Sequence, residues 1–167
     1  MAYDIIIIAG APGSGKTTVL NLISKKLTRP RIDFGILRQF HLDKDWKNAN
    51  SKEELMAFQN LVFIIKNYLK NKHINIMIED LKYDKVIDLM KIFSRTKIIL
   101  IILTVEENEL VKRVSNPRDS GFKNIKKALE YNKQWGECNI KNSVRIDNSY
   151  SNPEKTARKI LKIIKNG

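Results

Sequence analysis

A short run near the start of the chain carries the clearest chemical signal. The pattern G-x-x-x-x-G-K-[ST] is met in full by Gly10-Ala11-Pro12-Gly13-Ser14-Gly15-Lys16-Thr17. Its glycines let the backbone fold tightly and aim N–H groups at an anion, while the lysine adds a positive charge for phosphate groups. The Thr17 hydroxyl is a suitable Mg²⁺ ligand. We therefore expect this run, together with Thr18, to bind a nucleoside triphosphate and magnesium.

The segments on either side of this run are predicted to be a strand and a helix, which are the elements that flank a phosphate-binding loop. Five apolar residues, Ile5-Ile6-Ile7-Ile8-Ala9, precede it and predict a buried β-strand. After it, apolar residues recur at helical spacing and predict a helix over about 16–27. Strand, glycine-rich loop and helix together form the context in which the pattern binds phosphate.

Carboxylates follow two other predicted strands. Asp33 lies in an extended segment over about 31–37, and Glu79 and Asp80 follow a strand over about 74–78. Parallel α/β sheets bind ligands at the carboxyl ends of their strands, so we expect all three at the site. Glu79 or Asp80 would hold Mg²⁺, with a helix cap as the alternative for Asp80. Asp33 would take the proton of a hydroxyl acceptor, with a simple turn acid as the alternative.

The remaining segments alternate between strand and helix, which indicates an α/β protein with a parallel sheet between helical layers. We expect further strands at about 98–105 and 144–146. Helices are expected over about 51–71, 84–94, 106–115, 123–135 and from 153 onward. Ser51 to Glu54 reads as a capping box for the first of these, and Thr104 to Glu107 as the cap of the third. Asn152 should cap the last, with Pro153 at its first position.

Composition limits the classes of function. The 167 residues include one cysteine and no apolar run of the ~20 residues that a membrane span needs, so we expect one domain over 1–167, a cytoplasmic location and no membrane. The protein would be a monomer or a homodimer. The net charge of +13 leaves a nucleic-acid partner open. It does not favour one, because the lysines are scattered over predicted outer helix faces.

Two absences narrow the choice among phosphate-loop proteins. No Asn-Lys-x-Asp tetrapeptide occurs, which a guanine-reading GTPase would be expected to carry, so ATP is favoured over GTP. The chain is also short for an AAA+ motor with an additional helical domain.

The loop, followed much later by Leu110-x-x-Arg113-x-x-x-x-Arg118, resembles the nucleoside monophosphate kinase-like group of P-loop kinases, which includes adenylate, shikimate and gluconate kinases. The resemblance implies a three-layer fold with a five-stranded parallel sheet of order 2-3-1-4-5. It also implies a short lid at about 116–122 and an acceptor-binding region at about 33–58.

The resemblance implies roles for three further residues. Arg113 should lie against the adenine ring or the phosphates, and Arg118 should contact the transferring phosphoryl group, whose charged oxygens suit a planar guanidinium. Asn148 belongs to a segment whose backbone groups recognise the adenine base in this group. The short lid lacks the additional arginines of adenylate kinases, which weakens the case for a nucleotide acceptor.

These expectations combine into an ATP-dependent kinase that moves the γ-phosphoryl group to a small hydroxyl or phosphate acceptor. Its catalytic residues would be Lys16, Asp33, Arg113 and Arg118. One alternative is a polynucleotide 5′-hydroxyl kinase, favoured by the basic charge and by the pairing of Asp33 with Arg38. Another is an ATP-binding regulatory module with no acceptor.

Overall fold

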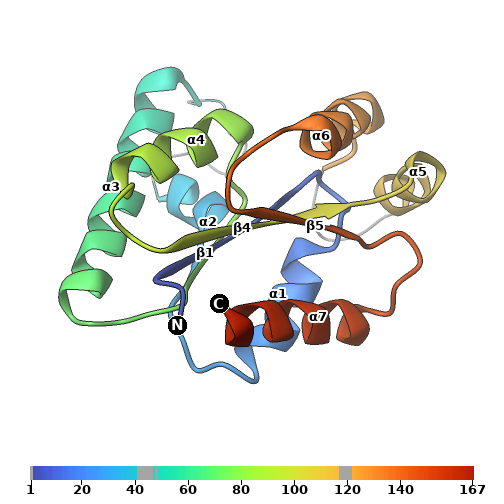
Figure 1. The fold of residues 1–167 in the computed structure, drawn as a ribbon. Coiled ribbons are helices and arrows are strands. Elements are labelled where there is room, and N and C mark those ends of the chain that lie inside the picture. Colours follow the sequence, from blue (N-terminus) through green and yellow to red (C-terminus); the bar gives the residue numbers. More distant parts are fainter. Residues whose placement is uncertain (1, 41–46, 48, 117–121) are drawn as a thin grey trace.

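Five parallel strands form one sheet in the order β2-β3-β1-β4-β5. The computed structural model describes residues 2–40, 47, 49–116 and 122–167, and Figure 1 shows helices on both faces of this sheet. The predicted fold and strand order are therefore confirmed. The strands are β1 (Ile5–Gly10), β2 (Arg31–Asp33), β3 (Ile76–Glu79), β4 (Ile98–Thr104) and β5 (Ser143–Asp147).

The helices divide between the two faces. α1 and α7 lie side by side on one face, while α3 and α4 cover the other (Figure 1). α6 contributes Trp135 to the second of these layers and also packs against α5. The helices are α1 (Lys16–Ser24), α2 (Phe34–Gln39), α3 (Ser51–Lys70), α4 (Tyr83–Ile92), α5 (Glu107–Ser115), α6 (Ile125–Glu137) and α7 (Pro153–Asn166).

The central strands are apolar on both sides because both sides are covered. In β1, Ile5 and Ile7 enter the core beneath α3 and α4, while Ile6 and Ile8 enter the core beneath α1 and α7. All four side chains are buried, as the alternation of a strand between two helical layers requires. A third apolar cluster joins α5 and α6 to Ala11 of the glycine-rich loop. The sheet thus fixes the loop's starting point, and α5 and α6 support it from outside.

The prediction of an extended segment over 31–37 was wrong beyond residue 33. The strand β2 ends at Asp33, and the helix α2 begins at the next residue. Asp33 is the reason, because its carboxylate accepts hydrogen bonds from the N–H groups of Gly35 and Ile36 and so caps the helix. Gly35, inside the segment that was predicted to be extended, belongs to the first turn of α2.

Two helix starts also differ from expectation, while a third agrees. Asn50, not Ser51, caps α3, because the Asn50 side chain accepts hydrogen bonds from Lys52 N and Glu53 N. α5 begins after Glu106 without a side-chain cap. Asn152 caps α7 and Pro153 occupies its first turn, as predicted. Among the helices described, none is both long enough and apolar enough to cross a bilayer.

Candidate active site

The glycine-rich loop connects β1 to α1 in a conformation that only glycine accepts easily. Gly10 and Gly15 have φ angles of 146° and 92°. A Cβ at Gly10 would lie 2.4 Å from the carbonyl oxygen of Leu103, and one at Gly15 would lie 2.6 Å from Asn148 Nδ2. Neighbouring backbone and side chain therefore leave no room for larger residues. This close packing holds the loop at the carboxyl end of β1.

Lys16 lies at the centre of the charged groups at this end of the sheet. Its ammonium donates hydrogen bonds to the carbonyl oxygens of Gly10 and Ala11, at 2.9 and 3.0 Å. Loss of hydration lowers the pKa of Lys16, and the nearby carboxylates of Asp80, Glu79 and Asp33 oppose that shift. The structure thus brings the predicted lysine and all three predicted carboxylates into one electrostatic cluster.

Thr17 and Glu79 bring a hydroxyl and a carboxylate together. The Thr17 hydroxyl donates to Glu79 Oε2 at 3.0 Å, and Glu79 is buried at the end of β3. Its other oxygen, Oε1, accepts from Arg31 Nε at 2.8 Å. A hydroxyl and one carboxylate are the protein ligands that Mg²⁺ takes when phosphates complete its shell, so these residues fit the metal. In the described part of the chain no group of three or more His, Cys, Asp or Glu side chains could hold a metal alone.

Asp33 and Asp80 meet across Gly35. A Cβ at Gly35 would lie 2.8 Å from Asp80 Oδ2 and 3.0 Å from Asp33 Oδ1, so the glycine allows both carboxylates to approach α2. Asp80 has a φ of 64°, which turns the chain sharply after β3. Desolvation raises the pKa of the Asp80 carboxyl, although Lys16 and Arg38 oppose this, and its side chain keeps 45% of its surface exposed.

An ion-pair network extends from this cluster to α3. The Arg38 guanidinium lies 3.2 Å from Asp80 Oδ2 and 3.7 Å from Glu54 Oε2. It also stacks over the Phe34 ring, 5.5 Å from the centroid. Lys82 reaches Glu54 Oε1 at 3.3 Å. Glu54 lies within the predicted acceptor region at 33–58, whereas sequence reasoning missed Lys82, which directly precedes α4.

Arg113 and Asn148 meet each other, although neither was predicted to contact the other. Arg113 donates from Nη2 to the carbonyl oxygens of Asn148, at 2.9 Å, and of Ser149, and its Nε pairs with Glu109 at 2.9 Å. The guanidinium expected at the nucleotide therefore holds the segment that follows β5.

The Asn148 side chain is turned toward the glycine-rich loop. Its Nδ2 donates to the Ser14 carbonyl oxygen at 2.8 Å, and its Oδ1 accepts from the Thr156 hydroxyl at 2.6 Å. The backbone N–H donates to the Thr104 carbonyl oxygen at 2.8 Å. Asn148 thus joins β4, the loop and α7 from a buried position. Sequence reasoning predicted that the backbone of Asn148 contacts the nucleotide. It missed the hydrogen bond from the side-chain amide to the glycine-rich loop.

Some of the predicted site residues lie outside the part of the chain that the structure describes. Arg118 lies outside the described residues, as does most of the predicted lid at 116–122. The predicted acceptor region at 33–58 is described except for residues 41–46 and 48.

The comparisons with known proteins agree with this geometry. Residues 6–134 match a family described as AAA domain, whereas no curated protein matches the sequence significantly. Among solved structures, a gluconokinase from Sinorhizobium meliloti aligns at a TM-score of 0.69 with 15% identity, covering 99% of this chain and 97% of that one. A thymidylate kinase from Candida albicans aligns at 0.69 with 14% identity, covering 99% and 92%.

A shikimate kinase from Aquifex aeolicus aligns at a TM-score of 0.59 with 17% identity, covering 97% of this chain and 96% of the other. Identities this low establish a shared fold. The family match spans most of the chain, including the loop, β3 and α5. This chain therefore belongs to the AAA domain family and has the fold of the P-loop kinases related to nucleoside monophosphate kinases.

Proposed function

We propose that this protein is an ATP-dependent kinase that transfers the γ-phosphoryl group to a small hydroxyl or phosphate acceptor. One observation carries the proposal: Lys16, the Thr17–Glu79 pair and two further carboxylates meet at the carboxyl end of one parallel sheet. The solved structures of similar fold carry the names of gluconate, thymidylate and shikimate kinases, which supports the reaction class. A cytoplasmic location, where ATP is available, belongs to the same proposal.

The loop would bind the triphosphate through backbone N–H groups of residues 13–17, with Lys16 reaching the β- and γ-phosphates and Thr18 completing the first turn of α1. Thr17 and Glu79 would hold Mg²⁺, and Asp80 is the alternative carboxylate. When bound, Mg²⁺ neutralises charge on the β- and γ-phosphoryl oxygens. Arg113 would act at the nucleotide by fixing the carbonyl groups of residues 148 and 149.

For an alcohol acceptor, Asp33 would accept the hydroxyl proton as the acceptor oxygen attacks the γ-phosphorus and ADP leaves. Its Oδ1 caps α2, so Oδ2 is the oxygen that we assign to this step. Arg118 would stabilise the charge on the transferred group, as the resemblance to the kinase group implies.

The test is an ADP-release assay with ATP, Mg²⁺ and a panel of acceptors: nucleosides, nucleoside monophosphates, sugars, sugar acids and a 5′-hydroxyl oligonucleotide. We expect one class of small molecule to raise ADP release well above the rate without acceptor. With that acceptor, Asp33→Asn should lower kcat by at least 100-fold, whereas Asp88→Asn, a half-buried carboxylate on α4 that pairs with Lys85, should leave kcat unchanged.

Two results would contradict the proposal. ATP binding without stimulation by any acceptor would favour the regulatory module instead. Transfer to the oligonucleotide alone would favour the polynucleotide 5′-hydroxyl kinase. If Asp80→Asn removes activity and Asp33→Asn does not, the kinase assignment stands but the proton acceptor is wrong.

A further inference from the structure

Positive charge is distributed unequally between the two helical layers. Beyond Lys16, the layer of α1 and α7 with the turn after α1 carries eight cationic side chains and one carboxylate, Glu154. The eight are Lys25, Lys26, Arg29, Lys155, Arg158, Lys159, Lys162 and Lys165. The helices α3 and α4 of the opposite layer carry five lysines and four carboxylates. By helix, α7 alone therefore carries a larger surplus of positive charge than α3 and α4 together.

The cations of this layer form no ion pairs within the described part of the chain, although Asp147 lies near Lys159. All eight are exposed, and none belongs to an ion pair among the residues that the structure describes. On the opposite face, by contrast, Lys82 and Lys85 pair with carboxylates. Unpaired like charges on one helix repel each other, so an anion bound across them would relieve that repulsion.

The cations of α7 form one stripe. Lys155, Lys159 and Lys162 are spaced by four and three residues, which places them on one side of the helix with about 5–6 Å between successive turns. The opposite side, with Ala157, Ile160 and Ile164, is buried against the sheet and α1. A linear polyanion lying along α7 would meet successive ammonium groups.

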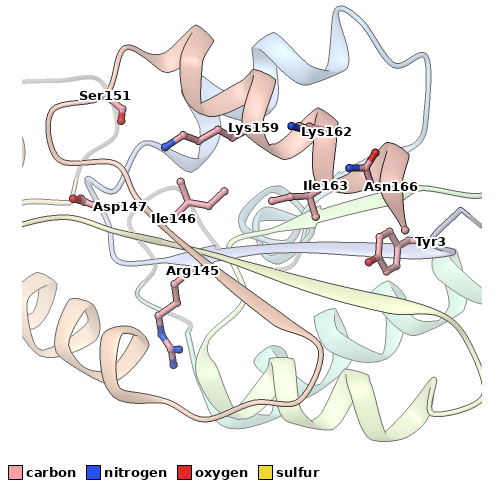
Figure 2. A pocket seen from close by; sticks show the side chains of 10 residues that line it. Tyr3, Arg145, Ile146, Asp147, Ser151, Lys159, Lys162, Ile163 and Asn166 are labelled. Atoms are coloured by element: carbon pink, nitrogen blue, oxygen red, sulfur yellow. The ribbon is translucent and has the colours of Figure 1, made fainter.

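A groove runs beside this stripe, between α7 and the edge strand β5. Its volume is about 720 Å³, and Lys159 and Lys162 line it together with Tyr3 (Figure 2). Ile146 and Ile163 contribute apolar surface between them. Asp147 is the carboxylate at one end of the groove, near Lys159. Such a volume accommodates one unstacked base or nucleotide, and the apolar surface suits a base face. The Tyr3 ring already has Lys97 over one face, 5.1 Å from the centroid.

We propose that the groove between α7 and β5, with the lysine stripe beside it, binds single-stranded nucleic acid. Lys155, Lys159 and Lys162 contact the phosphates, and the groove takes an unpaired base. A duplex fits less well because its bases are stacked and paired. The site is separate from the P-loop and does not depend on the proposed kinase activity.

A membrane surface is the less favoured occupant. Peripheral helices combine cations with exposed apolar anchors. The strongly exposed large apolar side chains of the described chain, apart from Tyr150 after β5, lie on or directly after α2, α3 and α4: Ile36, Phe40, Leu55, Phe63 and Ile92. The basic layer of α1 and α7 has none of these anchors.

The test measures binding of the full chain to a fluorescently labelled single-stranded 12-mer by anisotropy, at salt concentrations from 50 to 200 mM. We expect binding that weakens with salt, with a slope of log K against log salt of about −2 for three phosphate contacts. Lys155→Glu/Lys159→Glu/Lys162→Glu should weaken binding at least tenfold at 50 mM salt and bring the slope close to zero. ATP binding by this variant should stay within twofold of the wild type, which separates this site from the nucleotide site.

The matched control changes the net charge equally on the other face. Lys66, Lys70 and Lys91 are exposed on α3 and α4, and replacing all three by Glu should weaken binding less than threefold. Equal losses in the two triple variants would overturn the proposal, because they would show a net-charge effect. A wild-type slope near zero, or equally tight binding of polyglutamate or of vesicles containing phosphatidylserine, would also overturn it. If the first variant fails to fold, Lys162→Gln alone should still weaken binding about threefold.

Discussion

The two halves of the candidate site are held together by different interactions. On the phosphate side, neutral hydrogen bonds of buried groups fix the loop: Asn148 binds Ser14, and Thr156 binds Asn148. On the acceptor side, Arg38 forms ion pairs with Asp80 and Glu54 whose side chains are partly exposed. The loop is therefore held mainly through amides and carbonyls, and the acceptor side mainly through charges.

This difference affects what each half can do. A buried neutral hydrogen bond is costly to lose, because an unsatisfied polar group stays behind. A partly exposed ion pair contributes about 1 kcal/mol or less, and its partners can bind other charges at small cost. We expect the phosphate side to stay rigid and to serve any triphosphate, and the acceptor side to rearrange around its substrate.

The largest effect should come from Lys16→Ala. We expect the heat of ATP binding with Mg²⁺ to fall below detection and kcat to fall at least 100-fold, because the charge that faces the phosphates is removed. The melting temperature should not fall, since desolvation lowers the pKa of Lys16 and the charged form gains little from the fold. Calorimetry and thermal unfolding check both, with Lys25→Ala, an exposed lysine after α1, as control. Unchanged ATP binding would contradict the site.

A second change tests whether the neutral bonds position the loop. In Asn148→Asp a carboxylate replaces the amide that donates to Ser14, so two acceptors face each other. We expect a loss of about 2–3 kcal/mol in stability and an approximately tenfold weaker Kd for ATP. Thr156→Val is the matched control, because it removes the other hydrogen bond of Asn148 and leaves the bond to Ser14. It should cost about 1 kcal/mol and leave the Kd within twofold; equal effects on the Kd would refute a direct role of Asn148.

A third change separates the two halves. Arg38→Ala should raise the KM for the acceptor about tenfold and leave the KM for ATP within twofold, because the ion-pair partners of Arg38, Asp80 and Glu54, lie on the acceptor side. Its cost in stability should be about 2 kcal/mol, because Arg38 is mostly buried and its removal leaves Glu54 without this partner. Steady-state kinetics with both substrates varied provide the measurement, with the exposed Arg95→Ala as control. Equal changes in both KM values would show that the two halves are not separable.

The smallest effect concerns the segment after β5. Hydrogen bonds from the Ser149 hydroxyl and N–H lower the pKa of Asp147 below its unfolded value of 3.8. The carboxylate thus stabilises the fold above pH 3.8, and this contribution is lost as the pH falls through the folded pKa. Ser149→Ala should cost about 1 kcal/mol at pH 7, and this cost should shrink below pH 3.8.

Chemical unfolding across this range measures the effect. Part of the cost remains at low pH, because the Ser149 hydroxyl also accepts from Glu106 N. In an Asp147→Asn background the cost of Ser149→Ala should not vary with pH. A cost that stays constant in the wild-type background would contradict the assigned cause.

Much of the fold could be predicted because it depends on local pattern. The apolar run before the loop and the alternation of strand and helix indicated the parallel sheet, and Asn152-Pro153 marked the start of α7. The segment after Asp33 was predicted wrongly because a side-chain cap can start a helix where apolar residues suggest a strand. The prediction of Ser51 as the cap of α3 was also wrong, because the Asn50 side chain takes that role.

By itself, the sequence determined the phosphate loop, its lysine and threonine, and the carboxylates that end two strands, because spacing along a strand, turn or helix encodes them. Only the tertiary structure decided that the Asn148 amide binds the loop 134 residues away, that Arg113 holds the segment after β5, and that Glu54 pairs with Arg38 and Lys82. Such contacts depend on how distant elements pack. No local pattern specifies that packing, since the side chains that meet belong to segments that lie far apart along the sequence.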